Sequence, residues 1–163
     1  MTVDPYENPT AEDLDRFART LAPRAFNHTW ELLDLEERSS AAEEEMLGSA
    51  FTQRQLWYQV GSPRHRAIAD WQVSRVAVVL GYAELARRFG EVSLAVAQDN
   101  GLDPFVRAYA HEAIARAADE VDDYATRDRH VLAARELALE IEDDEDRTLL
   151  LADLELIPII EEG

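Results

Sequence analysis

SPRHRAIADWQVSRVAVVLG, residues 62–81, begins with a serine–proline pair and ends with a glycine. Serine is favoured as the residue that caps a helix N-terminus, proline in the first turn, and glycine just after the last turn. Between these ends, apolar residues recur at the four, three and four spacing of a buried helix face: Ala69, Val73, Val76 and Leu80. The sequence therefore predicts one helix over residues 63–80.

The same pattern returns 41 positions later as DPFVRAYAHEAIARAADEVD, residues 103–122, and Asp144-Glu145 opens a third helix start after another 41. Trp30 and Trp71 are separated by the same interval. A fixed period of this size is typical of stacked helical hairpins, each too small to bury its apolar face alone. We therefore expect an all-α protein of about seven to eight helices, built from stacked antiparallel hairpins.

Caps and apolar spacing place the individual helices, and no stretch shows the sustained alternation of a strand. Ser40 and Glu43 have the spacing of a capping box, and Gly61 is predicted to end its helix in the left-handed conformation. The predicted helices are Ala11–Leu21, Pro23–Glu36, Ser40–Val60, Pro63–Leu80, Ala83–Gln98, Pro104–Val121, Tyr124–Ile141 and Glu145–Glu155.

Chain length predicts one domain. The 163 residues suffice for one sizeable core. Residues 1–10 are polar, contain two prolines, and are expected to form a flexible lead-in. The helical domain is expected over residues 11–157, followed by a tail, residues 158–163, whose apolar start we expect to pack on the last hairpin.

The charge is strongly one-sided, with 34 acidic residues against 16 basic ones, all of them arginine, and a net charge of −18. Such a surface repels nucleic-acid phosphates and anionic membranes, so neither is expected as a partner. A basic protein or peptide is compatible with this charge, as is adaptation to salt or an arginine-rich codon bias. No apolar run approaches the roughly 20 residues of a membrane span, no signal peptide is recognisable, and we expect a cytoplasmic protein.

Catalytic and metal-binding patterns are missing from the sequence. Cysteine is absent, no Gly-x-Ser-x-Gly occurs, and the six glycines are scattered. None of the four histidines has a second one within four residues, and His111 and His130 lie at unequal distances from the turn at Asp122. We therefore expect no enzyme activity, no catalytic residue, no metal and no cofactor.

One group of aromatic and arginine residues is a candidate binding site. Trp30 and Trp71 occupy equivalent positions of neighbouring hairpins, and the helix between them carries another tryptophan and an arginine. Together they predict an aromatic groove with guanidinium donors, suited to a carboxylate or a peptide segment, although tryptophans at helical spacing are more often core. The predicted groove residues are Asn27, His28, Trp30, Arg54, Trp57, Trp71 and Arg75.

Two parts of the chain resemble units of the tetratricopeptide-like (TPR-like) superfamily. In Ala69–Leu94, Gly81 matches the turn glycine, Ala86 the small residue of the second helix, and Ser93-Leu94 the pair near its end. In His111–Ala134 the small residues are Ala115 and Ala134, with Asp122 in place of the turn glycine. The period is 41 here and about 34 in that motif. The resemblance implies a right-handed α-solenoid that binds protein or peptide in a concave groove.

The sequence thus favours a protein- or peptide-binding module whose tryptophans anchor the ligand and whose Arg54 and Arg75 orient its acidic groups. Two alternatives stay open. One is a helical bundle that binds a small molecule or a metal through His28 and its neighbours. The other is a structural homodimer that buries the tryptophan-bearing faces between its subunits.

Overall fold

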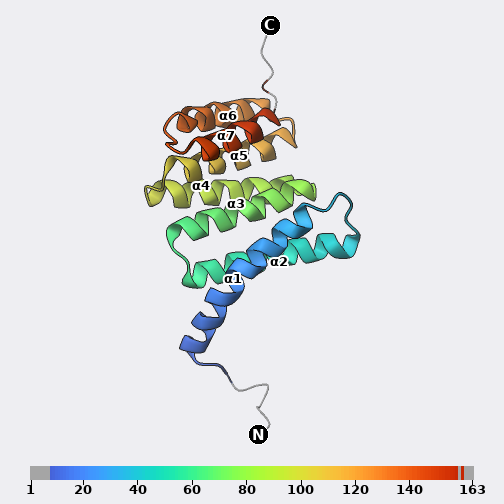
Figure 1. Ribbon diagram of the computed structural model, residues 1–163. Coiled ribbons are helices and arrows are strands. Elements are labelled where there is room, and N and C mark those ends of the chain that lie inside the picture. The colour runs from blue at the N-terminus through green and yellow to red at the C-terminus, as the bar shows by residue number, and fades with distance from the viewer. Residues whose placement is uncertain (1–7, 158, 160–163) are drawn as a thin grey trace.

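The computed structural model describes residues 8–157 and 159, and in this range the chain is all-helical, as predicted. Figure 1 shows α2 to α6 in chain order from the lower to the upper part of the view, with α1 overlapping α2 and α7 between α5 and α6. The described part contains no strand and seven helices: α1 (Ala11–Leu33), α2 (Ser40–Val60), α3 (Pro63–Val79), α4 (Ala83–Asp99), α5 (Pro104–Asp119), α6 (Tyr124–Ala138) and α7 (Asp144–Glu155).

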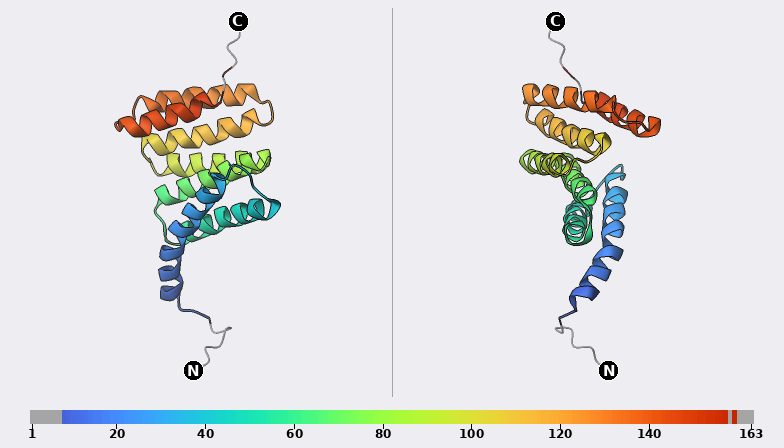
Figure 2. Two further views of the ribbon diagram at one scale, coloured as in Figure 1. Left: turned by 45° about the vertical axis from the view of Figure 1, so that its right-hand side comes forward. Right: turned by 90° about the vertical axis from the view of Figure 1, so that its left-hand side faces the viewer.

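Neighbouring helices in the chain pack on one another throughout, from α1 on α2 to α6 on α7. In addition, α3 contacts α5, and α5 contacts α7. Two further views show the same layered order, with the N-terminal part of α1 extending beyond the stack (Figure 2). The odd-numbered helices from α3 onward therefore lie beside each other.

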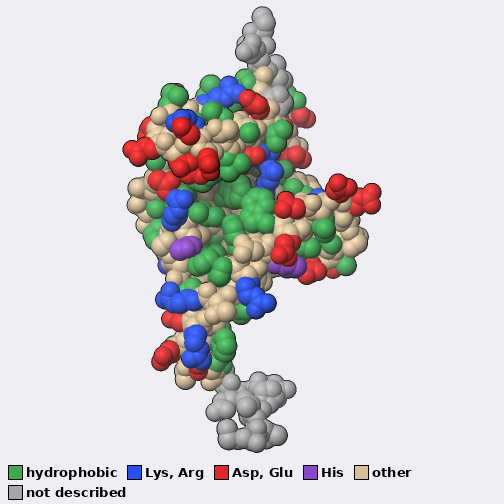
Figure 3. Space-filling model, in the orientation of Figure 1, with side chains coloured by type: hydrophobic (Ala, Val, Ile, Leu, Met, Phe, Trp, Pro, Cys, Tyr) green, Lys and Arg blue, Asp and Glu red, His purple; other side chains and the backbone are tan. Residues whose placement is uncertain are grey.

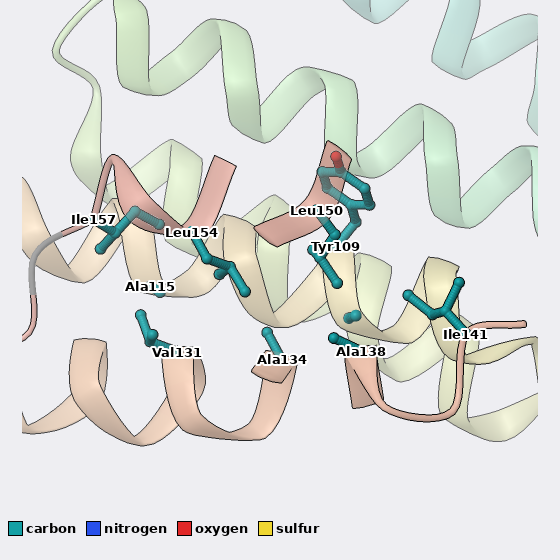
Figure 4. Close-up of a cluster of buried hydrophobic side chains, with 10 residues drawn as sticks. Tyr109, Ala115, Val131, Ala134, Ala138, Ile141, Leu150, Leu154 and Ile157 are labelled. Atoms are coloured by element: carbon teal, nitrogen blue, oxygen red, sulfur yellow. The ribbon is translucent and has the colours of Figure 1, made fainter. Parts of the chain in front are cut away.

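Small residues allow the central helices to approach closely. A Cβ added to Gly90 of α4 would lie 3.1 Å from the side chain of Ile114 in α5, so the two helices meet where one has no side chain. The buried face of α5 is rich in alanine. On its other side α5 packs against α6 and α7 around a buried cluster (Figure 4): Tyr109, Ala115, Val131, Ala134, Ala138, Ile141, Leu150, Leu154 and Ile157.

The first two predicted helices, Ala11–Leu21 and Pro23–Glu36, are one helix, α1, with Pro23 inside it. Proline removes one backbone hydrogen bond, and here its ring is exposed to solvent, so a helix held by other contacts accommodates it. Polar side chains supply such contacts. Ser49 of α2 donates to the carbonyl oxygen of Ala25 at 3.0 Å, and Gln72 of α3 donates to that of Phe26 at 3.0 Å.

Two predicted caps are wrong. Ser39 caps α2, accepting from the Ala42 N–H at 3.2 Å, one residue before the expected Ser40. Gly61 has φ −86° and ψ 160°, which is extended and not left-handed. Glycine is needed there because an added Cβ would come within 2.5 Å of the Trp57 carbonyl oxygen.

The tail is described only in part. Ile157 is buried in the cluster beneath α7, and Ile159 packs against it, as expected for the start of the tail. The lead-in residues 1–7 and tail residues 158 and 160–163 lie outside the described residues. In the described part of the chain, no helix combines the length and the apolar character needed to cross a membrane.

Glycine substitutions test the helix ends. Gly101 has φ +57°, so Gly101→Ala is expected to destabilise the protein by about 1 kcal/mol. Gly48, in the middle of α2 with open space around its Cα, is the matched control: Gly48→Ala is expected to stabilise by roughly 0.5–1 kcal/mol. Urea unfolding followed by circular dichroism measures both changes, and shifts of the same sign would contradict the assignment.

Candidate functional site

A row of aromatic side chains crosses the odd-numbered helices. Trp30 of α1 and Trp71 of α3, predicted to be neighbours, have ring centroids 5.7 Å apart. Trp71 meets Tyr109 of α5 edge-on at 5.4 Å, and Tyr109 meets Phe105 at 4.9 Å. These distances and tilts are those at which aromatic pairs attract each other. The rings therefore form one continuous wall.

This wall borders a pocket of about 330 Å³. Hydrophobic side chains gather on the corresponding face, between α1 and α7 (Figure 3). Leu149 of α7, 55% exposed, stands at the edge, and ten of the eleven lining residues come from odd-numbered helices. The volume lies in the range of ligand sites, roughly 300–1,000 Å³. The lining residues are Trp30, Ala67, Ile68, Trp71, Arg75, Ser93, Phe105, Val106, Tyr109, Leu149 and Asp153.

A polar network joins three of the lining residues, Trp71, Tyr109 and Asp153, to Glu112 and Arg116 outside the lining. Trp71 Nε1 donates to Glu112 Oε2 at 3.1 Å, and Arg116 Nε donates to the other oxygen of Glu112. Arg116 also donates to the Asp153 carbonyl oxygen at 3.2 Å, and Tyr109 Oη donates to Asp153 Oδ2 at 2.8 Å. Glu112 is only 1% exposed, and burial raises the pKa of its carboxyl group while Arg116 and Trp71 act against that rise. Burial also raises the pKa of Tyr109.

Arg75 lines the same pocket but has no such partner. Its guanidinium makes no hydrogen bond or ion pair with any residue that the structure describes. Burial, and then the charge of Arg116, lower its pKa, while the charges of Glu112 and Asp153 act in the opposite direction. Because arginine stays protonated at neutral pH, the pocket wall contains a partly buried cation that no carboxylate of the described residues contacts directly.

Four predicted groove residues lie elsewhere. Arg54 Nε donates to Asp70 at 2.5 Å, and Trp57 stacks on His65 with centroids 4.2 Å apart. Asp70 and Trp71 are consecutive in α3 and so point about 100° apart around the helix. A side chain that reaches Asp70 therefore does not face the pocket.

The other two are on the surface of α1. Asn27 is exposed, and His28 lies between Glu31 at 3.1 Å and Glu45 at 2.7 Å. These two carboxylates raise the pKa of His28. Neither Asn27 nor His28 lines the pocket, so three of the predicted residues, Trp30, Trp71 and Arg75, remain in it.

The sequence analysis did not identify Glu112 and Asp153 as residues near the pocket, although both lie at the repeat interval of 41 residues. Continuing from Trp30 and Trp71, the next positions are Glu112 and Asp153. All four sit on successive odd-numbered helices, where Trp71 bonds to Glu112 and Arg116 joins Glu112 to Asp153. Because the residue type changes along the series, a search for repeated residues stops at Trp71.

His111 of α5 and His130 of α6 contact each other, although they lie at unequal distances from the turn between the two helices. Nδ1 of His111 and Nδ1 of His130 are 2.8 Å apart, so one nitrogen must donate a proton to the other. Burial, His130 and Arg107 lower the pKa of His111 to about 4, and burial and Arg129 lower that of His130 against an opposing effect of Glu91. No group of three metal-ligating side chains lies together in the described residues.

The histidine pair predicts acid sensitivity. Both rings are neutral in the fold, so the stability they contribute is complete above the unfolded pKa of about 6.5 and is lost as the pH falls toward 4. Between pH 7 and 5 we expect His111→Asn to lose roughly 1 kcal/mol less unfolding free energy than the unmodified chain, given the partial exposure. Urea unfolding at both pH values measures this, and equal losses would contradict it.

The contact of Arg54 with Asp70 indicates that Arg54 stabilises the fold. Asp70 is 0% exposed, and removing Arg54 leaves the carboxylate with only the Tyr58 hydroxyl, 2.5 Å away. Arg54→Met is expected to destabilise by about 3 kcal/mol. Arg64→Met, which breaks an exposed pair with Asp103, is the control, with an expected change of about 0.5 kcal/mol or less. Similar losses in both variants, measured by chemical denaturation, would refute this role.

Comparisons with known proteins place the chain in no family. No family model, curated protein or solved structure matches it. What the pocket binds is therefore inferred from its own residues.

Proposed function

We propose that this chain is a divergent TPR-like helical-repeat module that binds another protein or a peptide. The apolar pocket beside the Trp30–Trp71 pair carries this proposal. An apolar side chain of the partner enters it and contacts the aromatic wall. Tryptophan and tyrosine are the residues that most often dominate the binding energy of protein interfaces.

The repeat architecture is part of the proposal. The pairs α1–α2, α3–α4 and α5–α6 are assigned as antiparallel hairpins stacked in a right-handed solenoid, with α7 after the last pair. Support comes from the packing of each pair and from the contacts of α3 with α5 and α5 with α7. The tryptophan and carboxylate series at intervals of 41 lies along these same helices.

Two properties of the pocket suit a segment of protein. It combines many apolar walls with few polar groups, which is the usual composition of a recognition pocket. The protein around the pocket has a net charge of −18. This charge attracts basic surfaces over a distance and repels nucleic acid and anionic membranes. A partner with an apolar anchor and a basic remainder fits both properties. We keep a cytoplasmic location as part of the proposal.

A small apolar molecule is the second candidate, favoured by the volume of about 330 Å³. The two candidates differ in which residues of the protein the ligand contacts. A small molecule uses the lining alone, whereas a protein partner also touches the rim and loses affinity when rim residues change.

Partner capture tests the proposal with a matched pair of leucines. Leu149→Arg places a long charged side chain at the pocket edge, and Leu139→Arg changes a leucine that is 84% exposed at the end of α6 and outside the pocket. Immobilised Leu149→Arg is expected to lose, about tenfold or more, a partner that the unmodified chain and Leu139→Arg both retain. Mass spectrometry of the retained proteins measures this. Retention of every partner by Leu149→Arg, Trp71→Ala and Arg75→Ala would remove the proposal.

A further inference from the structure

We propose that the bound segment carries an aspartate or glutamate next to its apolar anchor, and that Arg75 receives its carboxylate. This inference rests on the proposed function, because it assumes that the pocket takes an apolar side chain. It adds that the ligand residue next to the apolar anchor is acidic, and that Arg75 is the protein group that selects it.

The two arginines of the pocket region differ in what they bind. Arg75 and Arg116 are 41 positions apart and occupy equivalent places on α3 and α5. Arg116 is committed to Glu112 and Asp153. Arg75 has no carboxylate within ion-pair distance in residues 8–157 and 159, yet it faces the cavity. The N–H groups of the Arg75 guanidinium are therefore available to a ligand.

Burial strengthens this assignment. Arg75 is partly shielded from water and lies beside rings and aliphatic side chains, where opposite charges attract each other more strongly than in water. Its planar fork of N–H groups matches a carboxylate with two parallel hydrogen bonds. The charges of Glu112 and Asp153 act on Arg75 against that of Arg116, but neither carboxylate lies within ion-pair distance of the Arg75 guanidinium, so a ligand carboxylate would be its first direct partner.

A cationic ligand fits less well. The carboxylates near the pocket, Glu112 and Asp153, already accept hydrogen bonds from Trp71, Arg116 and Tyr109. The rings touch each other in a row, with centroids 4.9–5.7 Å apart, and so present one wall instead of opposing faces around an ammonium group. The uncommitted charge in the pocket is positive, and the ligand group should be negative.

The net charge of −18 limits how acidic the segment can be. Long-range repulsion acts on every acidic group of the ligand, whereas only the one at Arg75 gains a short-range partner. Salt screens the exposed charges more than the partly buried contact. Binding of a singly acidic peptide is therefore expected to hold or strengthen between 20 and about 150 mM salt, whereas purely electrostatic binding of a basic peptide weakens.

Two blocked dipeptides test the inference on the full chain. N-acetyl-Leu-Glu-amide and N-acetyl-Leu-Gln-amide share the apolar anchor and differ only in the side-chain charge. Titrations followed by the NMR signal of the Trp71 indole N–H are expected to give about tenfold tighter binding for the glutamate peptide. 4-Methylpentanoate and its amide form a second pair, which shows whether a free acid without a peptide backbone suffices.

Variants assign the preference to Arg75. Arg75→Gln is expected to bind both dipeptides equally, and Arg75→Lys to keep a reduced preference because it retains the charge without the fork. Arg64→Gln, whose arginine is exposed and outside the pocket, should keep the full preference. Circular dichroism melting confirms that each variant is folded.

The outcomes separate this inference from the proposed function. Equal affinities of the unmodified chain for both dipeptides would overturn the role of Arg75 and leave an apolar binding pocket. A preference that persists in Arg75→Gln would also overturn it. Binding of neither dipeptide would refute the inference, and the proposed function would fall with it only if Leu149→Arg also retained every captured partner.

Discussion

The hydrogen bond from the Trp71 indole to the buried Glu112 carboxylate holds the site in register. It joins α3 to α5 at one point, and Arg116 extends the connection to Asp153 of α7. Glu112 can remain buried because both its oxygens accept hydrogen bonds, one from a charged donor. With its N–H engaged, the Trp71 ring is fixed between Trp30 and Tyr109. The pocket wall thus depends on a polar contact behind it.

Much of the fold could be predicted, because helix starts and ends have local chemical causes. Ser62 and Asp103 cap the helices that follow them, and Gly81 and Gly101 have the positive φ expected after a helix. The errors arose where distant contacts outweigh local preference. Pro23 lies inside α1, which α2 and α3 hold through its carbonyl oxygens, and Gly61 is required by the nearby Trp57 carbonyl instead of by its own φ.

Of the site, only residues that recur at the 41-residue interval could be predicted from the sequence. The interval of 41 brought Trp30 and Trp71 together correctly, since it encodes positions on equivalent helices. It could not reveal that Arg54 turns to Asp70, which depends on the rotation of α2 about its axis. Tyr109 and Phe105 were missed because they follow no aromatic repeat, and Leu149 because its exposure is a tertiary property.

The pocket draws its lining from Trp30 near the start of the domain and Asp153 near its end. The pocket is therefore complete only when α1, α3, α5 and α7 are packed together. By thermodynamic linkage, a ligand that touches both α1 and α7 also opposes the fraying of these terminal helices. If the proposed function holds, such a ligand joins the C-terminal part of α1 to α7, and the bound protein should resist proteolysis in these two segments more than the free protein does.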